Sequence, residues 1–187
     1  SFAKALRSIL RQNPDVIMVG ETRDFETAEM AINASLTGHF VLSTLHTNDA
    51  PSAIARLDEM GVEPFMVSTA LIGVLAQRLL RKVCDNCRIP YNPTKEDIEQ
   101  FGLPKSDMDL NFYKANTLGH AELAAAKAGR GRICPKCGGN GYKGRVGCYE
   151  IMKMPERLQS AINKGATTDA IKEIAVAEGM KTLMSYS

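Results

Sequence analysis

Residues 13–24 read N-P-D-V-I-M-V-G-E-T-R-D, and the expected fold is built around this segment. Its first three residues are a turn signal, because proline fixes φ and disfavours the helical region for the residue before it. The apolar run Val16–Val19 has no polar alternation, which predicts a short strand covered on both faces in a parallel sheet. Glu21 follows at the carboxyl end of this strand, the edge at which open α/β sheets bind ligands. The alternative, a solvated turn carboxylate, is the commoner meaning of one apolar run followed by a glutamate.

A second strand and a connecting helix are predicted directly downstream. Asp24 is a suitable N-cap, apolar residues recur at helical spacing as far as Leu36, and Gly38 is suited to end the helix. Residues 40–45 read F-V-L-S-T-L and predict a second buried strand, with His46 directly after it. A strand, a helix and a strand in about thirty residues form a βαβ unit with parallel strands and a right-handed crossover.

The composition is ordinary for a soluble globular protein, with 44% hydrophobic and 24% charged residues. A formal net charge of +2 is too small to indicate nucleic-acid binding by itself. The longest apolar stretch, around residues 67–76, is interrupted by polar residues and is too short to span a bilayer. The first residues lack the layout of a signal peptide. We therefore expect no transmembrane segment in this sequence.

The pattern along the chain predicts three regions. Residues 1–83 hold a first helix over residues 1–12, the βαβ unit and two further helices, over residues 51–60 and 64–83. Residues 84–150 are rich in turns, charges and glycines. Residues 151–187 predict two or three amphipathic helices. Inside the middle region we expect short elements, namely helices over residues 95–101 and 122–128 and a strand over 145–152.

Four of the five cysteines form two C-x-x-C pairs, which lie at Cys84/Cys87 and Cys134/Cys137 with 46 residues between them. Two such pairs brought together give a tetrahedral four-sulfur site, which is the structural arrangement that Zn²⁺ prefers. A closed site of this kind leaves no position for water, so the expected role of the zinc is structural. An iron–sulfur centre and a pair of knuckles without metal are the alternatives.

Zinc ribbons of nucleic-acid and chaperone proteins share the glycine-rich surroundings of the second pair, C-P-K-C-G-G-N-G-Y-K-G-R. The alternative function is therefore a non-hydrolytic zinc-ribbon binding module that contacts nucleic acid or another protein. The V-G-E and T-L-H motifs at the strand ends argue against it, because a zinc ribbon has no use for them.

Three blocks occur in order and at compatible spacing: L-R-Q-N-P-D-V-I-M-V-G-E-T-R-D-F-E-T-A, T-G-H-F-V-L-S-T-L-H-T-N-D-A and Q-R-L-L-R-K-V-C-D-N-C. Together they closely resemble the secretion ATPase superfamily and, within it, the assembly ATPases of type IV pili and type II secretion systems. The resemblance covers essentially the whole chain. It implies an α/β fold, with part of a RecA-like ATPase domain over residues 1–83, a tetracysteine zinc-binding subdomain over 84–150 and C-terminal helices over 151–187.

The resemblance also implies a cytoplasmic homohexamer, peripheral to the inner membrane, that uses ATP and Mg²⁺ to assemble pilin or pseudopilin. Its implied partner is an inner-membrane platform protein, and nucleic acid is not expected to bind. The phosphate-binding loop G-x-x-x-x-G-K-[ST] is absent from these residues and would lie upstream of Ser1. We therefore expect the chain to be the C-terminal portion of such an ATPase and to be inactive by itself.

The family's Walker B block matches residues 16–21, which gives Glu21 the role of orienting the attacking water or holding a magnesium-bound one. Gly20 stands where many P-loop enzymes have an aspartate, so Glu21 has to act without that partner. The family's His box matches residues 37–49 and makes His46 a candidate sensor of the γ-phosphate. The alternative for His46 is a residue that caps the turn after it.

Three further residues are weaker candidates for nucleotide binding. His39 precedes the second strand and is expected to lie at the opposite edge from His46, where a structural role or a subunit contact is the alternative. Arg7 and Arg11 on the first predicted helix are candidate arginine fingers for a neighbouring subunit's phosphates. The alternative for both arginines is a solvated helix face.

Overall fold

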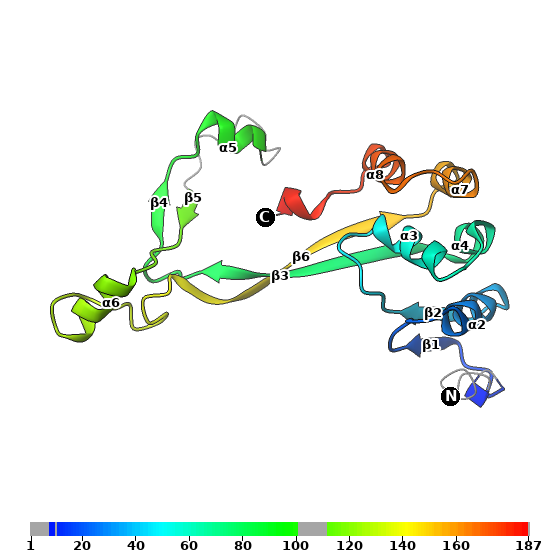
Figure 1. Cartoon of the computed structure of the whole chain (residues 1–187), viewed down its shortest axis with the longest axis horizontal. Coiled ribbons are helices and arrows are strands. Elements are labelled where there is room, and N and C mark those ends of the chain that lie inside the picture. The colour runs from blue at the N-terminus through cyan, green and yellow to red at the C-terminus, as the bar shows by residue number, and fades with distance from the viewer. Residues whose placement is uncertain (1–7, 10, 101–111, 187) are drawn as a thin grey trace. The chain divides into compact units, whose positions relative to one another are not determined.

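The computed structural model describes residues 8–9, 11–100 and 112–186 (Figure 1). Contacts between residues divide the chain into two units, Ser1–Ala76 with Tyr149–Thr182 and Gln77–Cys148 with Leu183–Ser187. The C-terminal helices thus belong by contact to the same unit as the predicted βαβ element. The division into an ATPase part, a zinc-binding subdomain and C-terminal helices, with boundaries at residues 83 and 150, stays a prediction.

The predicted βαβ element is present in the first unit (Figure 1). Strand β1 (Val16–Val19) pairs in parallel with strand β2 (Phe40–Ser43), and helix α2 (Phe25–Leu36) connects them. In the register of the pair, Ile17 lies opposite Val41. The carboxyl ends of both strands therefore meet at one edge, which is the geometry that the sequence predicted.

Helix α2 begins and ends at the residues that the sequence indicated. The Asp24 side chain accepts a hydrogen bond from the Thr27 N–H at 2.8 Å, as an N-cap does. After the helix, Gly38 adopts φ +101°, a conformation that favours glycine, and its N–H donates to the Ser35 carbonyl. The helix buries Met30 and two alanines against Ile17 of β1.

Only one face of the β1–β2 pair is covered within the described part of the chain. Ile17 and Val19 point into the small core under α2, whereas Val16 is 56% and Met18 73% exposed. The expectation of a strand covered on both faces is therefore wrong for these residues. The reason is the period of two in a strand, because a single helix layer can cover only every second side chain.

The remaining helices of the first unit are α3 (Ser52–Glu59), α4 (Pro64–Ala70), α7 (Glu156–Asn163) and α8 (Thr168–Ala177). Helix α7 packs against α4 and α8 and buries Leu158 and Ile162. The Ser68 hydroxyl of α4 donates to the Asn163 side-chain oxygen at 2.8 Å and ties the two helices together. Helices α7 and α8 confirm the amphipathic helices predicted for the C-terminal part.

The single long helix predicted over residues 64–83 is wrong. Helix α4 ends at Ala70, and strand β3 (Gly73–Val83) follows and pairs with strand β6 (Tyr142–Lys153). A Cβ atom at Gly73 would lie 3.1 Å from the Met152 carbonyl oxygen, so the two strands approach closely there. The apolar spacing fits a helix, but pairing with a distant strand overrides that local preference.

The second unit holds the middle parts of the chain. Strand β4 (Ile89–Tyr91) pairs antiparallel with β5 (Phe112–Lys114), and the short helices are α5 (Lys95–Gln100), α6 (His120–Lys127) and the 3₁₀ helix η2 (Leu183–Tyr186). Helices α5 and α6 lie where the sequence predicts helices. Among the described residues, no helix has the length and apolar character needed to cross a bilayer.

Candidate functional site

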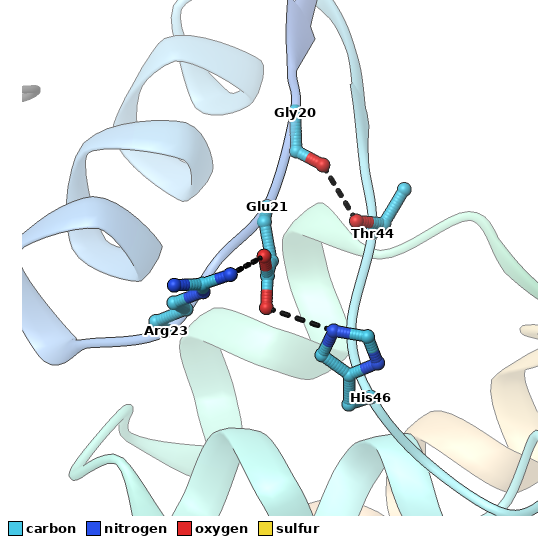
Figure 2. A network of polar contacts seen from close by, with 5 residues as sticks. All are labelled: Gly20, Glu21, Arg23, Thr44 and His46. Carbon is cyan, nitrogen blue, oxygen red and sulfur yellow. Dashed lines mark hydrogen bonds and ion pairs between the residues drawn. The ribbon is translucent and has the colours of Figure 1, made fainter.

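Glu21 and His46 lie side by side at the carboxyl ends of β1 and β2 (Figure 2). The Nε2 atom of His46 is 3.0 Å from Oε1 of Glu21, which is hydrogen-bonding distance. The Glu21 side chain is 23% exposed and that of His46 is 89% exposed. The pairing follows from the parallel register, which brings the residues after the two strands to the same edge.

Arg23 is the third side chain of this group, and its Nη2 atom lies 2.5 Å from Oε2 of Glu21 (Figure 2). One carboxylate oxygen of Glu21 thus faces the guanidinium and the other faces the imidazole. The sequence left Arg23 without an assigned role. A signal for the pair was its spacing, because residues two apart in an extended segment share a face.

The arginine keeps Glu21 in its charged form. The hydrogen bond from Arg23 is the main cause that lowers the pKa of the Glu21 carboxyl below its ordinary value of 4.5, with a smaller contribution from His46. Partial burial acts in the opposite direction and is outweighed. At neutral pH Glu21 is therefore a carboxylate, which accepts hydrogen bonds and can take a proton or a cation.

Hydrogen bonds between the two strand ends fix the spacing of the group. The Thr44 hydroxyl donates to the Gly20 carbonyl at 2.6 Å, as Figure 2 shows, and the Thr22 N–H donates to the Thr44 carbonyl at 3.0 Å. The hydroxyls of Thr22 and Ser43 are also 2.7 Å apart. Hydrogen bonds therefore join the two strand ends next to Glu21 and His46, although the side chains of these two residues are partly open to solvent.

The other predicted nucleotide-binding residues are not brought to this group. His39 lies before β2, so the strand separates it from His46, and its Nδ1 is 3.0 Å from the Ala34 carbonyl at the end of α2. This contact fits the structural alternative for His39. Arg11 is exposed and, within the described part of the chain, contacts neither Glu21 nor His46. Arg7 lies outside the described residues.

The four cysteines of the predicted metal site come together in the second unit. Their sulfur atoms all lie within 4.8 Å of one another, with Cys84 and Cys134 at 3.8 Å and Cys87 and Cys137 at 3.6 Å. A tetrahedral Zn²⁺ site with Zn–S bonds of about 2.3 Å has sulfur–sulfur edges of about 3.8 Å. The donor set and its spacing therefore fit a structural zinc ion.

Tight turns hold both cysteine pairs. The Cys87 N–H donates to the Cys84 carbonyl, and the Gly138 N–H donates to the Cys134 carbonyl at 2.8 Å. Gly138 has φ +63°, a conformation that glycine adopts without strain. Each turn therefore points both of its sulfur atoms to the same side.

Two thiols of the cluster differ in their acidity. Burial, together with hydrogen bonds to the other cysteines, raises the pKa of the Cys87 thiol to about 12. At Cys134 burial also acts to raise the pKa, but the backbone of Cys137 and the Asn86 amide outweigh it and lower the pKa to about 6. Since the thiolate is the form that binds a metal, these donors prepare Cys134 as a ligand.

Comparison with known proteins gives a consistent relationship. A family model described as "Type II/IV secretion system protein" matches residues 1–187. The chain is 50% identical over 183 residues to "Type IV pilus assembly ATPase PilB" of Thermus thermophilus, a match that covers 98% of the chain and 19% of that relative. It is 46% identical over 173 residues to "Type II secretion system ATPase E" of Vibrio cholerae, which covers 92% of the chain and 31% of that relative. The chain thus spans a fifth to a third of the length of these two relatives.

Solved structures agree with this relationship. The structure "Crystal Structure of the Pilus Retraction Motor PilT and Bound ADP" matches 98% of the chain and 37% of its own chain, with a TM-score of 0.59 and 27% sequence identity. The ATPase DotB of Yersinia pseudotuberculosis matches 95% of the chain and 33% of its own, with a TM-score of 0.57. At 19% identity, the second match supports the fold alone.

Proposed function

The chain belongs to the Type II/IV secretion system protein family, and from this premise we propose that it is the C-terminal portion of a hexameric ATPase. That ATPase couples ATP hydrolysis to the assembly of a type IV pilus or of a type II secretion pseudopilus. The two most informative relatives carry the names of these two machines. The single observation that carries the proposal within the chain is the 3.0 Å contact between Glu21 and His46 at the ends of two parallel strands.

Glu21 is the group that acts on the attacking water. Its carboxylate is ionised at neutral pH and accepts a hydrogen bond or a proton from that water, or holds a water bound to Mg²⁺. The hydrogen bond between Thr44 and Gly20 at the strand ends supports this role, because hydrolysis requires the base to be held in a fixed position. Bound ATP and Mg²⁺ supply the transferable phosphoryl group and neutralise its charge.

His46 senses the nucleotide from the adjacent strand end. Its ring is largely exposed and has one nitrogen on Glu21, so a change in its surroundings is transmitted directly to the carboxylate. His39, Arg11 and Arg7 stay weaker candidates for nucleotide contacts, from a neighbouring subunit or at the far end of β2.

The four cysteines hold one Zn²⁺ ion with a structural role. All four ligand positions of a tetrahedral site are taken by sulfur, so the ion offers no place for a substrate. The alternative function, a zinc-ribbon module that binds nucleic acid or protein without hydrolysis, explains this cluster. It gives no reason for the Glu21–His46 pair, and we therefore prefer the motor.

The parent protein is proposed to be a cytoplasmic homohexamer, peripheral to the inner membrane, that works on a membrane platform protein. The names of the relatives support the kind of machine, namely type IV pilus assembly or type II secretion.

One comparison tests the proposal. The complete protein should hydrolyse ATP, and the 187-residue chain alone should not, since no G-x-x-x-x-G-K-[ST] loop occurs in it. Steady turnover by the isolated chain, abolished by Glu21→Gln, would overturn the view that the phosphate-binding elements lie elsewhere. Absence of turnover in the complete protein would favour the binding module.

A further inference from the structure

A buried carboxylate on β6 contacts the loop that carries His46. Glu150 is 2% exposed, and its Oε1 accepts a hydrogen bond from the backbone N–H of Ala50 at 2.8 Å. Ala50 is itself fully buried. Both residues belong to the first unit, although they lie 100 positions apart in the sequence.

This hydrogen bond lies at the far end of the His46 loop. Residues 44–50, together with Pro51, connect β2 to α3 without regular secondary structure. At the strand end, Thr44 is bound to Gly20, and at the helix end, Ala50 is bound to Glu150. Between these two points His46 contacts Glu21, and the Asp49 side chain accepts a hydrogen bond from the Ser52 N–H at 3.0 Å. The Ala50–Glu150 bond is thus one of several contacts that hold the loop, and it is the one that comes from β6.

The place of Glu150 in its strand makes the contact unusual. Side chains of β6 alternate in burial, and the buried neighbours on either side of Glu150 are the apolar Cys148 and Met152. Burying a carboxylate among apolar side chains costs free energy unless hydrogen bonds compensate for the lost water. A carboxylate that accepts a backbone N–H makes one of the stronger hydrogen bonds, with a defined direction.

We propose that Glu150 is a positioning residue of the Glu21–His46 site. By holding the Ala50 amide it fixes the end of the loop 44–50 and with it the place of His46 beside Glu21. The effect on turnover rests on the function proposed above, whereas the effect on the loop does not.

The first experiment measures the loop itself. Amide hydrogen exchange of residues 44–50 is followed by mass spectrometry in the complete protein. The unsubstituted protein is compared with the variants Glu150→Ala, Glu150→Gln and Met152→Ala. Glu150→Ala should raise exchange across the loop, and Glu150→Gln should restore protection because its amide oxygen still accepts the Ala50 N–H. Met152→Ala is the matched control, a truncation on the same buried face of β6 that leaves this hydrogen bond in place.

The second experiment measures hydrolysis. If Glu150 acts through His46, Glu150→Ala should lower kcat by about tenfold or more, with a smaller change in KM for ATP. In a His46→Ala background the same change should cost little further turnover, since the residue being positioned is already gone. Glu150→Gln should retain most of the activity.

The outcomes separate the two proposals. Unchanged exchange of residues 44–50 in Glu150→Ala, or equal loosening in Met152→Ala, would overturn the role of Glu150 whatever the activity. Full kcat in Glu150→Ala, in a protein that Glu21→Gln inactivates, would overturn it as well. A complete protein without any hydrolysis would instead contradict the motor function, and the exchange data would still decide whether Glu150 orders the loop.

Discussion

His46 Nε2 lies 3.0 Å from Glu21 Oε1, and the two residues reach each other only because β1 and β2 are parallel neighbours. In an antiparallel pair the residues after the two strands would leave at opposite edges. The crossover helix α2 enforces the parallel arrangement, since a strand that returns through a helix on one face runs in the same direction as the first. The local fold is thus what creates the pair of a carboxylate and an imidazole.

Glu21→Gln tests the carboxylate in the complete protein. The change keeps size and most hydrogen bonding but removes the base and its negative charge. Hydrolysis should fall by roughly 10²-fold or more, the scale of losing a general base. Nucleotide binding should be largely kept, because the change leaves the proposed phosphate-binding elements of the complete protein untouched. Single-turnover hydrolysis and equilibrium ATP binding measure the two effects, and normal hydrolysis would make Glu21 a simple turn residue.

His46→Ala tests the adjacent strand end. Turnover should fall, and the difference in affinity between ATP and ADP should shrink, as expected of a residue that senses the γ-phosphate. The loss should not add to that of Glu21→Gln, since both side chains serve one transition state. His120→Ala is the matched control, because it removes an exposed histidine side chain from α6, to which no nucleotide role is assigned. An equal effect of the two histidine changes would contradict a specific role of His46.

Arg23→Ala tests the electrostatic support of Glu21. The arginine lowers the pKa of the Glu21 carboxyl, so its removal should raise that pKa back toward 4.5. A group with a lowered folded-state pKa stabilises the fold above its unfolded pKa, and this contribution is lost as the pH falls through the folded value. In Arg23→Ala the folded-state pKa should lie close to the unfolded one, so both this contribution and its loss at acid pH should become smaller. Carbon NMR titration of the Glu21 carboxyl in the 187-residue chain measures the pKa directly.

The control for this titration is Arg56→Ala. Arg56 forms an exposed ion pair with Glu59 on α3 at 2.9 Å, so its removal changes the net charge equally without touching Glu21. The same pKa shift in both variants would mean that long-range charge, and not the contact with Arg23, lowers the pKa. In the complete protein, the acid limb of the hydrolysis profile should move to higher pH in Arg23→Ala alone.

The sequence predicts the organisation of the site better than its details. The run Val16–Val19 followed by Glu21, and the run 40–45 followed by His46, are local patterns, and the parallel rule then brings their ends together. The spacing of Glu21 and Arg23 allows both side chains to share a face, but only if the chain stays extended after the strand, and the sequence pattern does not establish that. The hydrogen bond of Glu150 depends on a chain segment that no local window includes.

The wrong prediction of one helix over residues 64–83 also arises because the deciding contact comes from a distant segment of the chain. Its apolar residues recur at a spacing that suits a helix, and only two valines in Gly73–Val83 favour a strand by β-branching. Residues 73–83 form a strand because they pair with β6, which lies far along the chain. The exposed Val16 and Met18 are a related case, because a continuous apolar run indicates what a strand can bury and not what covers it.

The cysteine cluster gives the last prediction. The purified chain should contain about one zinc ion, bound by Cys84, Cys87, Cys134 and Cys137. Metal analysis after purification under reducing conditions without chelator measures it. Cys134→Ser should abolish binding, and Cys148→Ser is the control, since Cys148 is buried outside the cluster and should leave the zinc content unchanged.

Removal of the zinc should affect the second unit and spare the first. A zinc ion bound by the four cysteines would join Cys84 to Cys134 across the 46-residue segment between the two pairs. Its loss should release this segment and the turns at its two ends. Hydrogen exchange after chelation should therefore rise between residues 84 and 137. The β1–α2–β2 element has its own core of Ile17, Val19 and Met30 and should keep its protection. Loss of protection in both units on chelation would mean that the zinc site holds the entire fold, and that the two units do not fold independently.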